Sequence, residues 1–416
     1  MALGYNKKDK GTVYVGMSGG VDSSVSAALL KKDGYDVVGV YIKPWDPADD
    51  TETDWGIVCN WRTERREAMR AAAHLDIPLI TFDASKEYKE KVVDYLLGEY
   101  RAGRTPNPDV MCNKQIKFGV FYNWAKKTQT GPAFAEGFGR AKRRLTQAKD
   151  GEGEEDFLVA TGHYCKINVK SQKLEAKSES EKLNKLRNRN IDTDDTYQLA
   201  ISADKNKDQT YFLWNLRQEQ LAHILFPVGG YEKGEVRKLA KKFGLPNAEK
   251  KDSQGLCFIG QIDFKKFLAG QIPPKMGDVL NEAGEVIGHH DGAIFLTIGE
   301  RHGFTIEKKT PDQKPYFVVA KDIEKNTVTV SSEPNQTEVM TPTFDIRETN
   351  WISEIPTIGQ KYQARFRYRQ PLQTGKFIAL KNGEATFCFD EPQLKPAGQS
   401  LVIYDGDVCL GGGTIE

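Results

Sequence analysis

The chain lacks the features of a membrane, secreted or disulfide-rich protein. In its 416 residues, no apolar run approaches the roughly 20 residues that a membrane-spanning helix needs. The first residues, MALGYNKKDKGTVYVGM, contain neither the apolar segment of a secretion signal nor the Arg- and Ser-rich composition of a transit peptide. Six cysteines are too few for a disulfide scaffold. We therefore expect a soluble, cytoplasmic protein.

The chain also lacks an excess of charge of one sign. It carries 59 Lys and Arg against 58 Asp and Glu, a formal net charge of +1. Non-specific binding to a polyanion needs a broad positive field, which this balance does not supply. A local basic groove remains compatible with it. The length and the ordinary apolar content predict two or three globular domains of about 100–200 residues each.

The cysteines form no CxxC pair and have no zinc-ligand spacing. In a reducing compartment, each is by default a small, buried apolar side chain. Only Cys112 and Cys257 have neighbours that favour a reactive thiol. The other four are predicted to be structural: Cys59, Cys165, Cys388 and Cys409.

Strand-like and helical patterns alternate in the first half of the chain. Strand-like runs stand at 12–17, 36–43, 78–82 and 157–161, and helical patterns at 23–32, 60–75 and 85–102. This alternation predicts an α/β domain with a parallel sheet and right-handed crossovers. Such sheets bind ligands at the carboxyl ends of their strands, so we expect the chemistry in the loops after Met17, Lys43 and Thr161.

The pattern changes after about residue 260. Residues 209–244 are still predicted to be helical, whereas 278–287 and 317–330 are typical of strand pairs closed by turns. From Trp351 onward, frequent turns between strands indicate a small barrel. We predict an α/β domain over 1–262, a central linking domain over 263–332 and a C-terminal β-barrel over 333–416. Two polar segments near 128–156 and 171–194 are interpreted as insertions in the first domain.

The most informative segment is Gly16–Ser23, GMSGGVDS, between the first strand and the first helix. Glycines let the backbone curl around a ligand, and the following helix adds the positive end of its dipole. A pyrophosphate fits such a loop. Because the loop lacks the Gly-Lys-Ser/Thr ending of a Walker loop, transfer of a γ-phosphate is not expected. SGGVDS resembles the pyrophosphatase-type loop of ATP-dependent adenylating enzymes, which split ATP into AMP and pyrophosphate.

Cys112 follows a loop made rigid by two prolines, RTPNPDVM, and opens a predicted helix, CNKQIKF. A thiol at a helix N-terminus beside Lys114 is expected to favour its thiolate form. Asp109 is a candidate proton donor or acceptor. Cys257 lies in a glycine-containing loop, KKDSQGLCF, after two lysines that favour an anion. On these grounds alone, each cysteine is either reactive or buried and structural.

Basic and imidazole side chains offer weaker indications. Arg365, Arg367 and Arg369 alternate in the segment ARFRYRQ. Alternate residues of a strand share a face, so the arginines predict either a stripe along a phosphate backbone or a solvated strand face. His163 follows the fourth strand directly and is either structural or part of a site.

Taken together, these segments resemble one family over nearly the whole chain, the tRNA-specific 2-thiouridylases. The matching segments are GMSGGVDSSVSA at 16–27, RTPNPDVMCNKQIKF at 104–118, ATGHY at 160–164, KDQTYFLW at 207–214, FPVGGYEKGEVRKLA at 226–240, KDSQGLCFIG at 251–260, RYRQ at 367–370, PAGQS at 396–400 and VCLGGGTIE at 408–416. The resemblance implies a Rossmann-like, pyrophosphatase-loop ATP-binding domain and a C-terminal barrel that contacts tRNA. The family carries Met where Ile42 stands here, and its pattern has no counterpart of the two insertions.

The resemblance also implies roles for individual residues. Contacts with ATP, bound with Mg²⁺, are implied for Gly16, Met17, Ser18, Gly19, Gly20, Val21, Asp22, Ser23, Ile42 and Gly162. Asn107, Pro108 and Asp109 are implied to form the pocket of the target base, and Asp109 to shuttle a proton. Cys112 is the implied nucleophile, and Cys257 the residue that receives sulfur as a persulfide. Contacts with tRNA are implied for His163, Lys207, Asp208, Gln209, Arg367, Tyr368 and Gln399.

The implied reaction places sulfur on C2 of the wobble uridine, position 34, in the anticodon stem-loop. Adenylation of O2 makes this oxygen a leaving group, and a persulfide delivers sulfur directly or as hydrosulfide released through a transient Cys112–Cys257 disulfide. Because a stacked base cannot reach such a pocket, the uridine is expected to be flipped out. The implied partners are tRNA and a persulfide-donor protein, with the chain acting as a monomer away from membranes.

Three other functions remain open on the sequence alone. Another adenylating synthetase would share the loop but would not need Cys112 and Cys257, and no glutaminase segment is visible. A non-catalytic RNA-binding protein would not need an intact SGGVDS. A thiolase acting on a different tRNA uridine would share the chemistry. The ending VCLGGGTIE and the lack of an extra RNA-binding module in the sequence favour the wobble position.

Overall fold

The computed structural model describes residues 10–46, 61–129, 157–170, 195–251, 264–307, 314–333 and 340–416. The chain divides into two compact units, one of residues 1–46, 59–88 and 112–261, the other of residues 47–58, 89–111 and 262–416. The predicted insertion over 171–194 lies outside the described residues, and so does the one over 128–156 except for residues 128 and 129.

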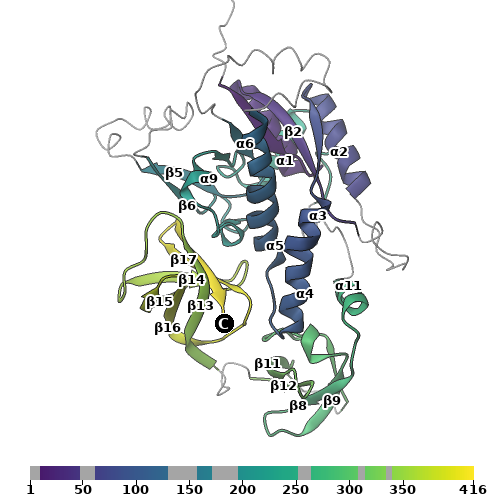
Figure 1. Cartoon of the computed structure of the whole chain (residues 1–416), viewed down its shortest axis with the longest axis vertical. Coiled ribbons are helices and arrows are strands. Elements are labelled where there is room, and N and C mark those ends of the chain that lie inside the picture. Colours follow the sequence, from purple (N-terminus) through teal and green to yellow (C-terminus); the bar gives the residue numbers. More distant parts are fainter. Residues whose placement is uncertain are drawn as a thin grey trace, which may run out of the picture. The chain divides into compact units, whose positions relative to one another are not determined.

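The first unit is built on a five-stranded parallel sheet (Figure 1). Its strands are β1 (Thr12–Gly16), β2 (Asp36–Lys43), β3 (Leu79–Asp83), β4 (Leu158–Ala160) and β7 (Ile224–Leu225). They stand in the order β3-β2-β1-β4-β7, and every neighbouring pair is parallel. The predicted parallel sheet is therefore confirmed. The strand order reverses between β1 and β4, which is where sheets of this kind bind ligands.

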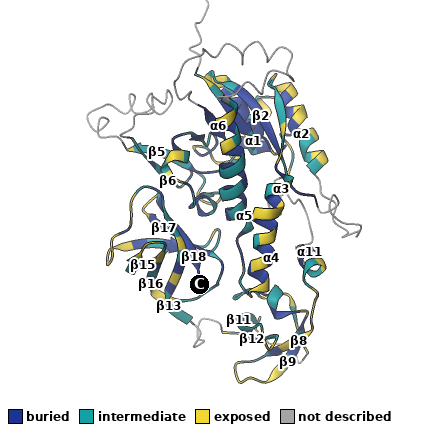
Figure 2. Cartoon of the chain, viewed as in Figure 1, coloured by how far each residue is buried: buried dark blue, intermediate teal, exposed yellow. Residues whose placement is uncertain are grey.

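The strands of this sheet are nearly continuous apolar runs because helices cover both of its faces. Val13 and Val15 of β1 pack with Tyr41 of β2 in a core that includes Ala27 of α1 (Val21–Asp33). Helix α2 (Trp61–His74) adds three alanines, at positions 68, 71 and 72. Figure 2 shows β2 and its neighbours largely in the colour of buried residues.

Two helical segments follow β3. The first comprises α3 (Ser85–Tyr88), the π-helix η2 (Lys89–Val93) and α4 (Asp94–Arg101), close to the predicted helix over 85–102. The second comprises α5 (Pro108–Met111), the π-helix η3 (Cys112–Phe121) and α6 (Tyr122–Gln129).

The second segment begins earlier than predicted, at Pro108 rather than at Cys112. Asn107 caps it: its Oδ1 accepts from the backbone N–H of Val110 at 3.4 Å, and its carbonyl accepts from that of Met111 at 3.2 Å. Asn is a favoured N-cap residue, and proline suits the first helical position because its missing N–H needs no partner there.

The predicted helix over 209–244 is wrong in its first half. The observed elements are the 3₁₀-helix η5 (Thr210–Phe212), α9 (Gln218–Leu221), β7 and α10 (Lys233–Lys242). Tyr211, Leu213, Trp214 and Leu216 are all buried. Their apolar pattern marks a segment packed on several sides rather than one face of an amphipathic helix. An antiparallel pair, β5 (Lys166–Lys170) and β6 (Thr196–Ala200), also belongs to this unit.

In the second unit, residues 264–333 form a small sheet with the strand order β10-β9-β8-β12-β11. The elements are α11 (Phe264–Gln271), β8 (Gly277–Leu280), β9 (Val286–His290), the 3₁₀-helix η6 (Ala293–Phe295), β10 (Phe304–Ile306), β11 (Phe317–Asp322) and β12 (Thr327–Ser331). Both predicted strand pairs are confirmed, since β8 with β9 and β11 with β12 are antiparallel.

The C-terminal part of the second unit is a closed barrel. Its strands are β13 (Met340–Trp351), β14 (Lys361–Arg365), β15 (Gln373–Lys381), β16 (Glu384–Leu394), β17 (Ser400–Asp405) and β18 (Val408–Ile415). Antiparallel pairs link β13-β16-β15-β14-β17-β18, and a β13–β18 pairing closes the ring. Phe377, Phe387 and Phe389 meet edge to face inside it. The predicted barrel is confirmed, and the exact domain boundaries at 262 and 332 stay predictions.

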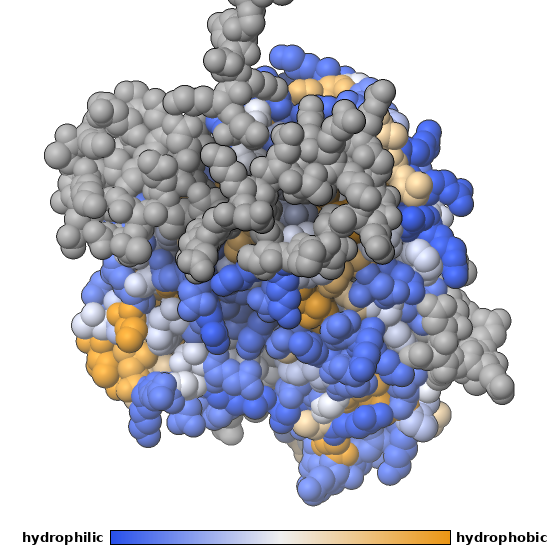
Figure 3. Space-filling view, turned by 45° about the horizontal axis from the view of Figure 1, so that its top comes forward, coloured by the Kyte–Doolittle hydropathy of each residue, from blue (hydrophilic) through white to orange (hydrophobic). Residues whose placement is uncertain are grey.

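On the face seen in Figure 3, the described residues are mostly hydrophilic, with apolar groups gathered in a few places. On the barrel, Ile355, Ile358 and Ile378 are exposed. Among the described residues, none of the helices has both the length and the apolar character needed to cross a bilayer.

Candidate functional site

Residues Gly16–Ser23 form the turn from β1 into α1. Gly20 is the N-cap of α1 in an extended conformation, and Gly19 has a φ of +74°, which favours glycine. A Cβ on Gly19 would lie 2.3 Å from the carbonyl oxygen of Glu64. The turn therefore presents backbone rather than side chain at this point, with the positive end of α1 directed at it.

The serines of this turn hold its shape. Ser23 Oγ donates to the carbonyl of Gly20 at 3.2 Å and accepts from the N–H of Ser18 at 3.3 Å. Ser24 Oγ donates to the same carbonyl at 2.9 Å. Because these bonds are made within the free protein, the loop is preorganised for an anion.

Gly162 follows β4 and packs on the first turn of α1. A Cβ at this position would stand 2.7 Å from the backbone nitrogen of Ser23 and 2.9 Å from the carbonyl carbon of Asp22. Ile42, buried near the end of β2, is paired with Phe82 of β3. The phosphate loop, Ile42 and Gly162 therefore come from the carboxyl ends of three adjacent strands, as predicted. Their contacts with ATP stay predictions.

Two residues that the sequence analysis missed, both in the segment after α10, hold the loop. Asn247 Nδ2 donates to the carbonyls of Gly19 at 3.1 Å and Gly20 at 3.2 Å, and to Ser24 Oγ at 2.9 Å. Lys250 Nζ donates to the carbonyl of Gly19 at 3.2 Å. Asn247 Oδ1 is buried without a hydrogen-bond partner in the described part of the chain. In the sequence, the paired lysines at 250 and 251 indicated a site that favours an anion, and Asn247 had no such indication.

Asp22 is engaged by two other elements. Lys233 Nζ, from the first turn of α10, lies 2.7 and 2.8 Å from its two carboxylate oxygens, and the hydroxyl of Tyr164 donates to Oδ1 at 2.9 Å. The Asp22 and Lys233 side chains are 30% and 14% exposed. This half-buried pair ties the start of α1 to α10, so the Asp of the SGGVDS motif has a structural role here.

Cys112 is a buried cysteine that forms no disulfide with the described residues, and it is the first residue of η3. Its predicted place at a helix N-terminus is wrong, because α5 precedes it and the dipole effect falls off within the first turn. Cys257 lies outside the described residues, as do all of 252–263.

A buried pair joins η3 to the loop after β4. Lys117 Nζ lies 3.3 Å from Nε2 of His163, whose Nδ1 lies 2.7 Å from Oγ1 of Thr161. Burial, and secondarily the charge of Lys117, hold the pKa of His163 well below its usual range. Since an ammonium only donates, Nε2 accepts and Nδ1 carries the proton. Both ring nitrogens thus have protein partners, and the contact of His163 with tRNA stays a prediction.

The segment Lys207–Gln209 forms a turn before η5. Asp208 is buried, and its carboxylate accepts from Thr210 Oγ1 at 2.7 Å and from the N–H of Ser202 at 3.2 Å. Gln209 Oε1 accepts from the N–H of Tyr164 at 2.9 Å. Asp208 and Gln209 therefore shape the turn, and the predicted contacts of all three residues with tRNA are untested.

The residues predicted to hold the target base lie at the start of α5 in the second unit. Asn107 is its N-cap, Pro108 its first residue and Asp109 its second. The two residues directly before them, Thr105 and Pro106, accept hydrogen bonds at their carbonyls from Gln399 Nε2. Their contacts with a base, and that of Gln399 with tRNA, stay predictions.

The predicted arginine stripe is wrong. Arg365 is buried and donates from Nε at 3.1 Å and Nη2 at 2.9 Å to the hydroxyl of Tyr404. Strand β14 ends at this residue, so Arg367 and Arg369 lie beyond it and do not share its face. Arg367 donates to a main-chain carbonyl at 2.6 Å, and Arg369, with a φ of 62°, lies over the ring of Tyr368. The contacts of Arg367 and Tyr368 with tRNA stay predictions.

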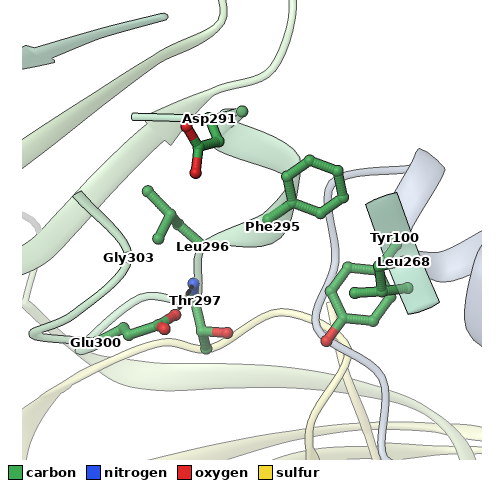
Figure 4. A pocket seen from close by; sticks show the side chains of 9 residues that line it. Tyr100, Leu268, Asp291, Phe295, Leu296, Thr297, Glu300 and Gly303 are labelled. Carbon is green, nitrogen blue, oxygen red and sulfur yellow. Dashed lines mark hydrogen bonds between the residues drawn. The ribbon is translucent and has the colours of Figure 1, made fainter. Parts of the chain in front are cut away.

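The second unit also contains a pocket of about 190 Å³ that the sequence analysis did not predict (Figure 4). The rings of Tyr100 and Phe295 and the carboxylates of Asp291 and Glu300 lie around it. Glu300 Oε2 accepts from the N–H of Thr297 at 2.9 Å. Among the described residues, no group of three or more His, Cys, Asp and Glu side chains suits a metal ion.

Comparison with known proteins covers almost the whole chain. Three family models match in order: the tRNA methyl transferase HUP domain over 11–154 and 139–261, the tRNA methyl transferase PRC-barrel domain over 265–332, and the aminomethyltransferase beta-barrel domain over 341–415. The tRNA-specific 2-thiouridylase MnmA of Lacticaseibacillus paracasei is 40% identical over 407 residues, 97% of this chain and 94% of that protein. The MnmA proteins of Geobacillus thermodenitrificans (39% over 406 residues, 97% and 94%) and Streptococcus mutans (40% over 412 residues, 98% and 95%) are similarly close.

Proposed function

The chain belongs to the tRNA-specific 2-thiouridylase family, and from this premise we propose that it is an ATP-dependent sulfurtransferase acting on C2 of the wobble uridine, position 34, of tRNA. One observation carries the proposal. Gly162 packs on the backbone of Ser23 in the phosphate loop, and the next residue, His163, bonds Lys117 of η3, the π-helical segment that also contains Cys112. The phosphate loop and the thiol-bearing helix are thus linked through two consecutive residues of one sheet edge.

The residues around Gly16–Ser23 fit the phosphates of a nucleotide. Positions 19 and 162 have no room for a side chain, which leaves backbone and the N-terminus of α1 to face an anion. The ammonium group of Lys250 donates a hydrogen bond to the carbonyl of Gly19 and so places a positive charge at the loop. The adenine is proposed to lie at the end of β2, beside Ile42. Mg²⁺ is proposed to arrive with the nucleotide, because the described residues hold no cluster of carboxylates for it.

In the proposed reaction, ATP supplies the adenylyl group that turns O2 of uracil into a leaving group. The helix dipole of α1 and the ammonium of Lys250 stabilise negative charge on the phosphates. Asn107 and Asp109 are proposed to orient the flipped base, with Asp109 moving a proton. In this step the protein groups bind, orient and move a proton, and none of them forms a covalent bond to carbon or phosphorus of the substrates.

Sulfur transfer is assigned to the two cysteines. Cys257 is proposed to receive a persulfide from a donor protein. In the first route, the terminal sulfur attacks C2 and displaces AMP, and the Cys112 thiolate then attacks the sulfur of Cys257, which breaks the S–S bond, leaves sulfur on C2 and forms a disulfide. Alternatively, the terminal sulfur is first released as hydrosulfide. In the second route, the Cys112 thiolate attacks the sulfur of Cys257, a disulfide forms, and the departing hydrosulfide displaces AMP from C2. A dithiol reductant then restores both thiols.

Nucleoside analysis of tRNA incubated with the protein, ATP and glutathione persulfide tests the proposal. We expect 2-thiouridine at position 34 with the wild-type protein, none with Cys112→Ser or Cys257→Ser, and an undiminished yield with Cys388→Ser as the control. ATP consumption without 2-thiouridine would instead support another adenylating synthetase. Thiolation at a different uridine would contradict the wobble assignment.

A further inference from the structure

The loop that leads into the proposed base pocket is held by other parts of the second unit. In the segment between η6 and β10, Thr297 Oγ1 accepts from Thr105 Oγ1 at 3.1 Å. Gly103 lies against Ile323, where a Cβ would come within 2.5 Å of its Cγ1. The loop Gly103–Pro106 is therefore packed rather than free, although it has no secondary structure of its own.

The barrel holds the same loop by its backbone. Thr105 N–H donates to the carbonyl of Ala397 at 3.0 Å. Gln399 Nε2 donates to the carbonyl of Thr105 at 2.8 Å and to that of Pro106 at 3.1 Å. A primary amide has two N–H donors, so both hydrogens of the Gln399 side chain are engaged by the loop.

The turn that carries Gln399 is itself fixed. Gly398 has a φ of +89°, and a Cβ there would stand 2.8 Å from the carbonyl oxygen of Thr105. The last strand, β18, holds both residues, since Gly398 N–H donates to the carbonyl of Ile415, and Ile415 N–H to that of Gln399, each at 2.8 Å. Gln399 is thus a rigidly mounted donor aimed at two carbonyls.

These carbonyls directly precede Asn107, the cap of α5. Fixing the carbonyl of Pro106 fixes the peptide plane from which Asn107 starts, and Asn107 in turn caps α5, which carries Asp109. A base pocket built on a loop needs such support, because a displacement of about 1 Å in a reacting group can cost about a hundredfold in rate.

We propose that Gln399 is a positioning residue, through which the C-terminal barrel sets the geometry of the base pocket at Asn107–Asp109. This inference rests on the proposed function for the identity of the pocket. In the structure, both N–H groups of the Gln399 side chain are directed at carbonyls of the loop, so Oε1 is the atom left to contact tRNA. Removal of this side chain is therefore expected to lower the rate of the chemical step more than the affinity for tRNA.

Gln399→Met tests the proposal, since methionine keeps the length of the side chain and removes both donors. Gln393→Met is the matched control, because among the described residues Gln393 Nε2 bonds two barrel groups, Gln373 Oε1 and the carbonyl of Glu391. Single-turnover 2-thiouridine formation at saturating tRNA, and the Kd for tRNA, are measured for both variants. We expect the Gln399→Met rate to fall about tenfold or more, with its Kd within about twofold of the wild-type value and the control unchanged.

Hydrogen exchange of the free protein gives a readout that does not depend on activity. The amides of Val110 and Met111, which bond Asn107, are expected to exchange faster in Gln399→Met and not in Gln393→Met. If Gln399→Met does not fold, Gln399→Asn, whose shorter side chain cannot reach both carbonyls, replaces it.

The outcomes separate this inference from the proposed function. A weaker Kd with an unchanged rate at saturating tRNA would overturn the inference and leave a plain RNA contact. Unchanged exchange at Val110 and Met111 would overturn it as well. A wild-type protein that forms no 2-thiouridine would contradict the proposed function, and the exchange measurement would still decide the role of Gln399 in the loop.

Discussion

The phosphate loop of the first unit and the Arg365–Gln370 segment of the barrel both carry polar motifs just beyond a strand. In the loop, local glycines, serine hydroxyls and the start of α1 set most of the geometry, and Asn247 and Lys250 add bonds to carbonyls that the motif already presents, so the motif was enough to predict the turn. In the barrel segment, the arginines turn to three different partners, among them the hydroxyl of Tyr404, which lies 39 positions away in the sequence. A motif therefore predicts a site well when its own backbone makes the site, and poorly when distant side chains decide where its members point.

The largest effect is expected at Gly162. In Gly162→Ala, the new Cβ would collide with the backbone of Ser23 and Asp22, so α1 or the loop after β4 must shift. Because that backbone is proposed to bind the phosphates of ATP, we expect the Kd for ATP to rise at least about tenfold. Gly230→Ala, with nothing within 4 Å of its added Cβ, is the control for calorimetric titration. Equal affinities in the two variants would mean that the loop does not bind the nucleotide.

Arg365 is expected to act on stability rather than on RNA binding. Arg365→Met leaves the hydroxyl of Tyr404 without its donors, and we expect a loss of about 2 kcal/mol in the free energy of unfolding. Arg369→Met, at a stacked surface position, is expected to cost less than about 0.5 kcal/mol. Urea denaturation measures both variants. If tRNA binding by Arg365→Met depended less on salt than binding by the wild-type protein, Arg365 would contact a phosphate of the tRNA, contrary to the buried position described here.

The Asp22–Lys233 pair gives a smaller effect. It is half-buried, so Lys233→Met is expected to destabilise the first unit by about 1 kcal/mol, after allowance for solvent screening. The exposed pair of Lys241 with Glu249 supplies the control, Lys241→Met, with an expected cost near zero. A double-mutant cycle with Asp22→Asn isolates the interaction, and a coupling of zero would contradict the structural role of this aspartate.

The smallest effect concerns pH. The pKa of His163 is lowered in the folded state, so its contribution to stability is complete above its unfolded value of about 6.5 and is lost as the pH falls below it. We expect the Tm of the wild-type protein to drop more between pH 7 and pH 5 than that of His163→Gln. Parallel slopes for the two proteins would show that the imidazole is not held neutral.

The same contrast explains how much the sequence could predict. The parallel strands, the phosphate loop and the closed barrel follow from runs of residues that are neighbours in the chain. The sequence analysis placed the start of the helix at Cys112 instead of Pro108. It treated the two prolines as part of a loop, although Asn107 and Pro108 are a favourable cap and first residue of a helix. Asn247 and Gln399 could not be assigned these roles, since their bonds to Gly19 and Thr105 span 228 and 294 positions. No local pattern records contacts of that range.

The central claim is that O2 of the target uracil leaves the base as part of AMP. It is tested most directly with a tRNA whose position-34 uridine carries ¹⁸O at O2, incubated with the protein, ATP and glutathione persulfide. The account predicts one ¹⁸O atom in AMP for each 2-thiouridine formed, as measured by mass spectrometry. Label found in pyrophosphate, inorganic phosphate or water, with 2-thiouridine still produced, would contradict it.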